Sequence, residues 1–189
     1  MDMVVPVGRF PVPGETLMGS SYEMLPGGKG ANQALAAARM GPKVALVGCV
    51  GDDGTGMRML AGLKRDGVMT SGVGQSELPT GMAVIIAAQD GENEIIVAPG
   101  ANREARADQI PNEILKPSNV LLLQGETKAE ENWVLLQRAK KHGVTTILNL
   151  APVMEIPKEA LANIDYLVVN LLEAGQIAKA LGIDLHHDA

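Results

Sequence analysis

The sequence predicts an α/β fold, a parallel sheet with helices on both faces, accompanied by a small extra β-sheet. Short β-branched runs alternate with helical stretches through the middle and end of the chain, a pattern typical of parallel strands joined by crossover helices. A glycine-bounded, alanine-rich helix follows residue 30, and a hairpin pattern occupies residues 81–100. The length of 189 residues suits a single domain with one core.

The α/β elements can be placed in order along the chain. Residues 31–40 form the clearest helix, because alanine has the highest helix propensity and a glycine stands where the helix would end. A second helix is expected at residues 56–65, with Met57, Leu60 and Ala61 facing inward. The remaining expected elements are strands at 44–50, 120–124, 145–149 and 166–169, and helices at 129–141, 158–164 and 172–181.

Two regions depart from this alternation. Residues 82–89 and 94–98 flank the turn formers Asp90 and Gly91, which predicts a β-hairpin. Near the start, residues 4–5 and 22–25 are short extended candidates. These strands are expected to form a small separate sheet, and the pattern alone supports a lid over a cleft and an ordinary antiparallel edge equally well.

Composition excludes several classes of partner. A net charge of −6 and an isoelectric point near 5.1 argue against nucleic acid or an anionic membrane as the main partner. No apolar run reaches the roughly 18 residues that a membrane span requires, and the first residues do not resemble an export signal. The single cysteine allows no disulfide framework, which favours a cytoplasmic protein.

A glycine-rich segment at residues 27–33 leads directly into the alanine-rich helix. Glycine leaves no Cβ to keep a ligand away, a helix start offers unpaired amides, and Lys29 adds a full positive charge. Such a loop suits hydroxyl-rich or anionic ligands, although a flexible connection explains the glycines equally well. Both common phosphate loops are excluded, because Glu23 and Gly30 break the Walker pattern and Gln33 breaks the dinucleotide fingerprint.

Polar side chains follow the predicted parallel strands, at the edge where open α/β sheets bind ligands. Each has an ordinary alternative role: a helix cap for the aspartates, a turn before Pro152 for Asn149, or a complement to a helix dipole for Glu173. Together they suggest sugar hydroxyls and a hydrated metal ion as ligands. The residues concerned are Asp52, Asp53, Glu126, Asn149, Asn170 and Glu173.

Taken together, these motifs resemble the ribokinase-like (PfkB-type) carbohydrate kinases over essentially the whole chain. The lysine and glutamine of the glycine-rich segment are more similar to ribokinases than to fructokinases, which favours ribose. The motifs, in family order, are Phe10-Pro11-Val12-Pro13-Gly14-Glu15-Thr16, Gly27-Gly28-Lys29-Gly30-Ala31-Asn32-Gln33-Ala34, Gly51-Asp52-Asp53, Pro99-Gly100-Ala101-Asn102 and Asn149-Leu150-Ala151-Pro152.

The resemblance implies site residues and cofactors. Asn170 and Glu173 match an N-x-x-E element, in which the asparagine lies near phosphate and the glutamate holds Mg²⁺ through water, with ATP as phosphate donor and K⁺ as a further ion of the complete protein. Residues 1–25 and 80–101 correspond to a lid that builds homodimers in many members, and residues 26–79 and 102–189 to the α/β core. The expected sugar-binding residues are Asp2, Gly28, Lys29, Asn32 and Glu126.

The chain also departs from the family pattern. The family's first core strand would precede Asp2, and its catalytic aspartate and most of its nucleotide pocket would follow Ala189. We therefore expect no catalytic residue within residues 1–189 and negligible kinase activity from them alone. The main alternative is a non-catalytic sugar-binding or dimerisation module of the same fold. A kinase for another sugar, such as fructose, or for a nucleoside is a further alternative.

Overall fold

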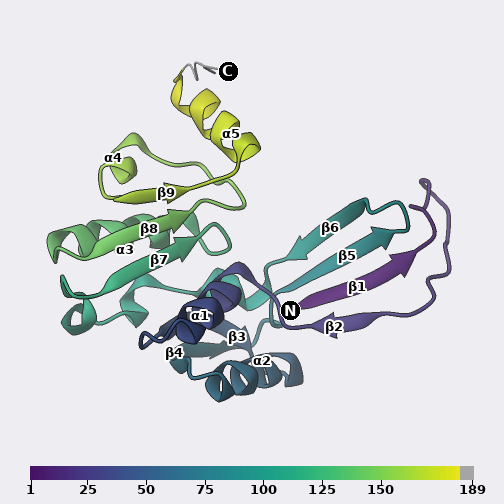
Figure 1. Ribbon diagram of the computed structural model, residues 1–189, viewed down its shortest axis with the longest axis horizontal. Helices are drawn as coiled ribbons and strands as arrows, with labels where there is room; N and C mark the ends of the chain where they lie inside the picture. Colours follow the sequence, from purple (N-terminus) through teal and green to yellow (C-terminus); the bar gives the residue numbers. More distant parts are fainter. Residues whose placement is uncertain (184–189) are drawn as a thin grey trace. The chain divides into compact units, whose positions relative to one another are not determined.

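The computed structural model describes residues 1–183 (Figure 1). The chain divides into two compact units, Met1–Arg103 and Glu104–Ala189. None of the described helices is long and apolar enough to cross a membrane.

A four-stranded mixed sheet belongs to the first unit. Its strand order is β2-β1-β5-β6; β1 pairs antiparallel with β2 and parallel with β5, and β5 pairs antiparallel with β6. The predicted hairpin and the predicted separate sheet are thus confirmed, and the turn at Gly91 adopts a positive φ of 91°. The strands are β1 (Asp2–Val7), β2 (Glu23–Leu25), β5 (Met82–Ala88) and β6 (Asn93–Ala98).

The rest of the first unit is a small α/β layer. It contains α1 (Lys29–Arg39), β3 (Ala45–Gly51), α2 (Gly54–Arg65) and β4 (Met69–Ser76), and β3 pairs parallel with β4. The sequence pattern did not predict β4, because its glycines resemble a loop. A Cβ on Gly72 would lie only 2.8 Å from a methyl carbon of Val47, so that glycine permits close packing of the two strands. The shared core consists of Ala34, Leu63 and Val68, packed against Ala31, Leu35, Ala38, Val44 and Leu46.

The inward face of α2 differs from the expected one. Met57 is 62% exposed, and the buried residues of the helix are Gly56 and Leu63. A Cβ on Gly56 would lie 2.7 Å from the carbonyl oxygen of Gly51. The backbone of α2 at Gly56 therefore packs directly against the end of β3. The expectation that Met57 and Ala61 face inward is therefore wrong, because close backbone approach at Gly56 sets the rotation of the helix.

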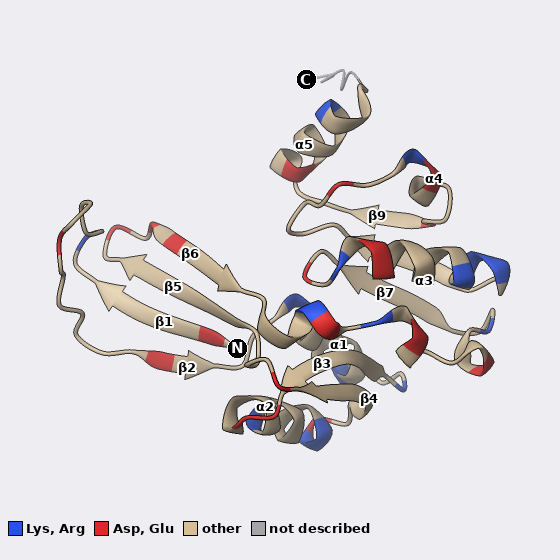
Figure 2. Ribbon diagram, turned by 180° about the vertical axis from the view of Figure 1, so that it is seen from behind, with Lys and Arg blue, Asp and Glu red and all other residues tan. Residues whose placement is uncertain are grey.

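The second unit contains a three-stranded parallel sheet ordered β7-β8-β9. Leu136, Leu148 and Leu150 are fully buried and form its core. Helix α3 lies along β7 and β8 and carries acidic residues in its first turn and basic residues in its last, which complements its dipole (Figures 1 and 2). The elements are β7 (Val120–Gln124), α3 (Ala129–Lys141), β8 (Thr145–Asn149), α4 (Lys158–Leu161), β9 (Tyr166–Val168) and α5 (Leu171–Leu181).

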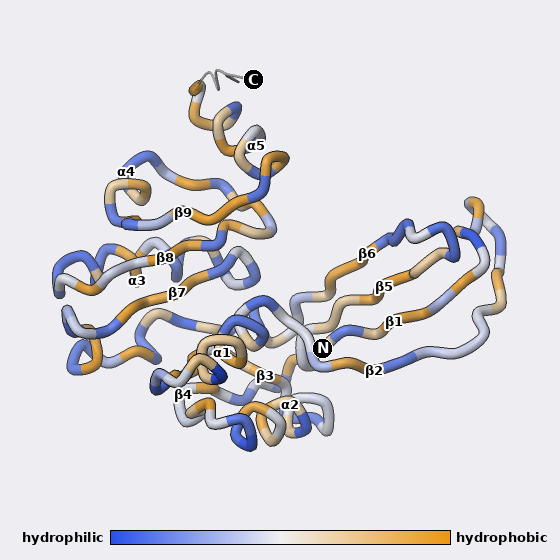
Figure 3. The backbone as a smooth tube through the Cα atoms, in the orientation of Figure 1, coloured by the Kyte–Doolittle hydropathy of each residue, from blue (hydrophilic) through white to orange (hydrophobic). Residues whose placement is uncertain are grey.

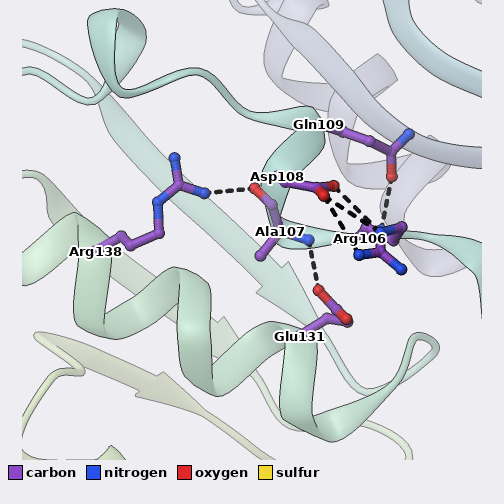
Figure 4. A network of polar contacts seen from close by, with 6 residues as sticks. All are labelled: Arg106, Ala107, Asp108, Gln109, Glu131 and Arg138. Carbon is purple, nitrogen blue, oxygen red and sulfur yellow. Dashed lines mark hydrogen bonds and ion pairs between the residues drawn. The ribbon is translucent and has the colours of Figure 1, made fainter.

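Three short 3₁₀ helices precede β7: η1 (Gly100–Glu104), η2 (Ala107–Gln109) and η3 (Asn112–Ile114). Arg138 of α3 donates to the Ala107 carbonyl oxygen at 2.6 Å, and Glu131 accepts from the Ala107 amide at 2.7 Å (Figure 4). Arg138 also donates to the Ile110 carbonyl oxygen at 2.5 Å. These charge-assisted hydrogen bonds hold the backbone around η2 on α3. No motif in the sequence predicts them.

Strand β6 is apolar in sequence but exposed in the structure. Ile95, Ile96 and Val97 are 55%, 66% and 60% exposed, and they form part of the hydrophobic stretch visible on β6 (Figure 3). Because consecutive residues of a strand point to opposite faces, side chains on both faces of the sheet are uncovered at this strand within the part of the chain that the structure describes.

Candidate functional site

Asp2, at the start of β1, lies against the loop that precedes α1. Its carboxylate occupies the space that a Cβ on Gly27 would need. The pairing of Asp2 with Leu25 across β1 and β2 brings these two segments together. Gly27 is buried and Asp2 is half-buried. Glycine at position 27 therefore makes room for the carboxylate of Asp2.

Gly28 is the N-cap residue of α1 and has a φ of 93°, a conformation that favours glycine. Its carbonyl oxygen accepts from the amide of Asn32 at 2.9 Å. Lys29, half-buried, and Asn32, exposed, both lie in the first turn, which carries no acidic residue. A carboxylate, an ammonium group, an amide and the positive end of a helix thus belong to one local region, an arrangement suited to a hydroxyl-rich ligand.

The second unit gathers polar residues at the carboxyl edge of its sheet. Gln124 pairs with Asn149, and Asn149 pairs with Val168, so the three strands end side by side. Asn149 donates to the carbonyl oxygen of Val168 at 3.0 Å, rather than only stabilising a turn. The prediction that these strand ends share an edge is confirmed for this sheet.

Glu126 follows β7 in a turn that packs on Ala151 and Pro152, just after the end of β8. A Cβ on Gly125 would collide with the carbonyl oxygen of Pro152, and the Gly125 amide donates to Ala151 at 3.2 Å. Buried Asn132 of α3 braces the same turn by donating to the Gln124 carbonyl oxygen at 2.8 Å. This role of Asn132 could not be predicted from the sequence, because a lone asparagine in a helix is usually exposed.

Asn170 and Glu173 form a reciprocal cap at the start of α5. The Glu173 amide donates to Asn170 Oδ1, and the Asn170 amide donates to Glu173 Oε2, both at 2.8 Å. This is the capping-box geometry, so the N-x-x-E spacing has a structural role whatever ligand it serves. Within residues 1–183, no group of three or more His, Cys, Asp or Glu side chains is placed to hold a metal ion.

Asp53 and Asp52 differ in their surroundings. Asp53 caps α2 by accepting from the amide of Gly56 at 2.7 Å, and it also accepts from the amide and hydroxyl of Thr80, both at 2.8 Å. The Thr80 amide is the main cause of a lowered pKa for Asp53, followed by the amide of Gly56. The helix-cap role is therefore confirmed for Asp53, whereas Asp52 is exposed.

Comparisons with known proteins identify the family and the fold of the chain. The profile of the pfkB family carbohydrate kinases matches residues 1–189. A ribokinase from Haemophilus influenzae is 42% identical over 177 residues, which cover 92% of this chain and 58% of that protein. A ribokinase from Bacillus subtilis is 37% identical over 186 residues, 97% of this chain and 63% of that protein.

Two solved structures show the same fold. A ribokinase from Thermotoga maritima has a TM-score of 0.87 at 35% identity, covering 98% of this chain and 61% of its own. An Arabidopsis thaliana ribokinase solved with ribose and ATP has a TM-score of 0.80 at 32% identity, covering 96% of this chain and 64% of its own. The chain thus has the α/β ribokinase-like fold and spans about 60% of the length of these relatives. It belongs to the pfkB family of carbohydrate kinases.

Proposed function

We propose that the complete protein is an ATP-dependent kinase that converts ribose to ribose 5-phosphate, and that residues 1–189 supply most of its sugar-binding part. One observation carries the proposal: the Asp2 carboxylate is held against Gly27, next to the first turn of α1 with Lys29 and Asn32. The ribokinase names of the relatives and the ribose-bound Arabidopsis structure support ribose as the sugar.

The proposed sugar site uses charge and amide chemistry. The Asp2 carboxylate accepts hydrogen bonds from neighbouring sugar hydroxyls, while Lys29 and the Asn32 amide donate to sugar oxygens. Gly28 has no side chain, which lets the sugar approach the backbone. Glu126 is proposed as a further acceptor for sugar hydroxyls.

The proposed phosphate region contains Asn170 and Glu173. Mg²⁺ keeps several waters and is commonly held by one or two carboxylates together with substrate phosphates. A single half-buried carboxylate, with Oε2 already accepting from Asn170, fits such a water-mediated role and does not fit a cage made only of protein groups. Bound Mg²⁺ would neutralise phosphate charge, and K⁺ is a further proposed ion of the complete protein.

In the proposed reaction the γ-phosphoryl group leaves ADP and bonds to a sugar hydroxyl oxygen, whose proton passes to a base. We assign no base to residues 1–189, because the resemblance places the family's aspartate outside them. We therefore expect negligible kinase activity from this polypeptide alone. An ordinary turnover of ribose and ATP with magnesium by purified residues 1–189 would contradict this expectation. A cytoplasmic location is also proposed, because the sequence holds a single cysteine, Cys49, and so no disulfide framework.

A second candidate function is a non-catalytic sugar-binding or dimerisation module. The exposed apolar residues of β6 support its dimerisation part, since a second copy of the four-stranded sheet would cover them. For the kinase and for the non-catalytic module alike, we propose that this four-stranded sheet acts as a lid and also forms a homodimer. Sedimentation of the purified chain at increasing concentration tests the dimer, and an Ile96→Glu variant should shift it to monomer.

Sugar identity and completeness need separate experiments. Calorimetric titration of the folded chain with ribose, fructose and adenosine should give the strongest binding with ribose. Preference for fructose or adenosine would reassign the substrate while keeping the family. An in-frame Gly-x-Gly-Asp segment in the coding sequence downstream of residue 189 would support the kinase, and a stop codon there would support the non-catalytic module.

A further inference from the structure

The connection from β4 to β5 is fixed at Thr80. Asp53 Oδ1 accepts from the Gly56 amide at 2.7 Å and from the Thr80 hydroxyl at 2.8 Å, and Oδ2 accepts from the Thr80 amide at 2.8 Å. A helix cap requires only the bond to Gly56. The two bonds to Thr80, 27 residues further along the chain, attach the start of α2 to the segment that enters the four-stranded sheet.

Thr80 is buried, and its hydroxyl makes two hydrogen bonds. It donates to Asp53 and accepts from the Gly51 amide at 3.0 Å. Space around it is tight: a Cβ on Gly51 would lie 2.5 Å from the Thr80 nitrogen, and one on Gly56 would lie 2.8 Å from its hydroxyl oxygen. Thr80 therefore has little freedom to shift relative to the end of β3.

The second strand connection crosses at the same place. The Ala101 amide donates to the Pro79 carbonyl oxygen at 2.8 Å, and a Cβ on Gly81 would lie 2.7 Å from the Pro99 carbonyl oxygen. Two segments join the strands β5 and β6 to the rest of the chain, residues 79–81 and residues 99–101. These segments therefore pack on each other beside Thr80.

From Thr80 a short series of backbone contacts leads to Asp2. The Gly81 carbonyl oxygen accepts from the Met1 nitrogen at 3.2 Å, and the Ala83 amide donates to the Met1 carbonyl oxygen at 2.9 Å. Asp2 pairs directly with Ala83 in the parallel register of β1 and β5. Thr80 is therefore connected, through Gly81 and Met1, to the start of β1, where the Asp2 carboxylate meets Gly27.

We propose that Asp53 and Thr80 are positioning residues for the sugar site: their hydrogen bonds fix β5 at Gly81 and so hold the Asp2 carboxylate in place for sugar hydroxyls. The claim that these hydrogen bonds fix β5 and Asp2 rests on the contacts alone, whereas the claim that they serve sugar binding rests on the proposed function. The lowered pKa of Asp53 agrees with it, because the carboxylate stays ionised and accepting at neutral pH.

The test combines amide exchange with ribose titration of the purified chain. In Thr80→Val, which keeps the shape and removes the hydroxyl, the Ala83 amide should exchange at least about tenfold faster than in the wild type. Ribose should bind about tenfold more weakly in the same variant. Thr80→Ser restores the hydroxyl and should restore both properties.

Thr146 offers a matched control in the second unit. Like the Thr80 hydroxyl, the Thr146 hydroxyl both donates and accepts: it lies within donating distance of the Asn163 carbonyl oxygen, at 2.8 Å, and of Asp165 Oδ2, at 3.1 Å, and it accepts from the Asp165 amide at 3.0 Å. Thr146→Val should speed exchange in β8 and leave the Ala83 amide at its wild-type rate. Equal acceleration at Ala83 in both valine variants would overturn the proposal, since the effect would then be general destabilisation.

A second variant keeps the test decisive if Thr80→Val does not fold. Asp53→Asn retains an oxygen for the Gly56 amide but turns an NH₂ group toward the Thr80 amide, and it should also speed exchange at Ala83. Unchanged Ala83 exchange in a folded variant refutes the positioning role. If the wild type binds no ribose while Ala83 responds as expected, the structural connection stands and the sugar-site assignment fails.

Discussion

Asn170 and Glu173 each donate a backbone amide to the other's side chain, at 2.8 Å in both directions. The two residues that the family resemblance places near phosphate and magnesium are therefore also the cap of α5. Any test of their ligand role has to separate it from the cap.

Asn170→Ala and Glu173→Gln separate the hydrogen bonds of the cap from the negative charge of Glu173. Asn170→Ala removes the acceptor for the Glu173 amide and should lower the free energy of unfolding by about 1 kcal/mol, measured by urea titration. Glu173→Gln keeps an oxygen for the Asn170 amide but removes the charge, so stability should change by less than about 0.5 kcal/mol. A loss as large in Glu173→Gln as in Asn170→Ala would show that the charge, rather than the hydrogen bond, stabilises the helix start.

Gly27→Ala tests the contact between Asp2 and the glycine-rich loop. The new Cβ would occupy the space of the Asp2 carboxylate, which must then move, so we expect loss of stability and of ribose binding. Gly62→Ala is the matched control: it makes the same chemical change inside α2, where a Cβ meets nothing within 4 Å. It should stabilise the protein by about 0.5–1 kcal/mol in urea unfolding. Wild-type ribose affinity in Gly27→Ala would contradict the proposed place of Asp2.

Thr70→Val should stabilise the protein. Thr70 is buried in β4, and its hydroxyl has no hydrogen-bond partner among the residues that the structure describes. Replacing it with an isosteric methyl should raise the free energy of unfolding by about 1 kcal/mol. Thr146→Val makes the same replacement where the hydroxyl is bonded to Asn163 and Asp165, and it should cost about 2 kcal/mol. Destabilisation by Thr70→Val would indicate a bound water at that hydroxyl.

Stability should fall at acid pH because of Asp53 and Asp165. Hydrogen bonds from Thr80 and Thr146, respectively, lower the pKa of these carboxyls in the folded protein. Their stabilising effect is fully present above the unfolded-state pKa of about 3.9 and is lost as pH falls toward the lower folded-state value. Urea unfolding from pH 7 to pH 3 should show this decline. Asp53→Asn should show a shallower decline, and an identical slope would exclude Asp53 as a contributor.

Much of the fold could be predicted from the sequence because its helices and strands follow simple periodicity. Strands β7 and β8 and helix α3 have the predicted bounds, since β-branched runs and an amphipathic helix identify them directly. Strand β4 was missed because its glycines serve close packing on β3, a tertiary effect invisible to local propensity. The rotation of α2 was misjudged for a similar reason, the backbone contact at Gly56.

The residues of the candidate site could be named from the sequence, but their arrangement in space could not. The sequence places Asp2 far from Gly27 along the chain, and only the pairing of β1 with β2 brings them together. The supports of the site, Thr80 and Asn132, carry no motif, because their roles depend on partners 27 and 8 residues away in the chain. Long-range hydrogen bonds of this kind follow from the fold and not from spacing.

Calorimetric titration of ribose into folded wild-type, Asp2→Ala and Asn32→Ala proteins tests the central claim most directly. The proposed site predicts a measurable heat of binding for the wild type and a Kd at least about tenfold higher in each variant. Each variant removes a protein side chain that would form hydrogen bonds with the sugar. No ribose heat from the folded wild type, or unchanged affinity in both variants, would contradict the assignment of the sugar site to Asp2 and the first turn of α1.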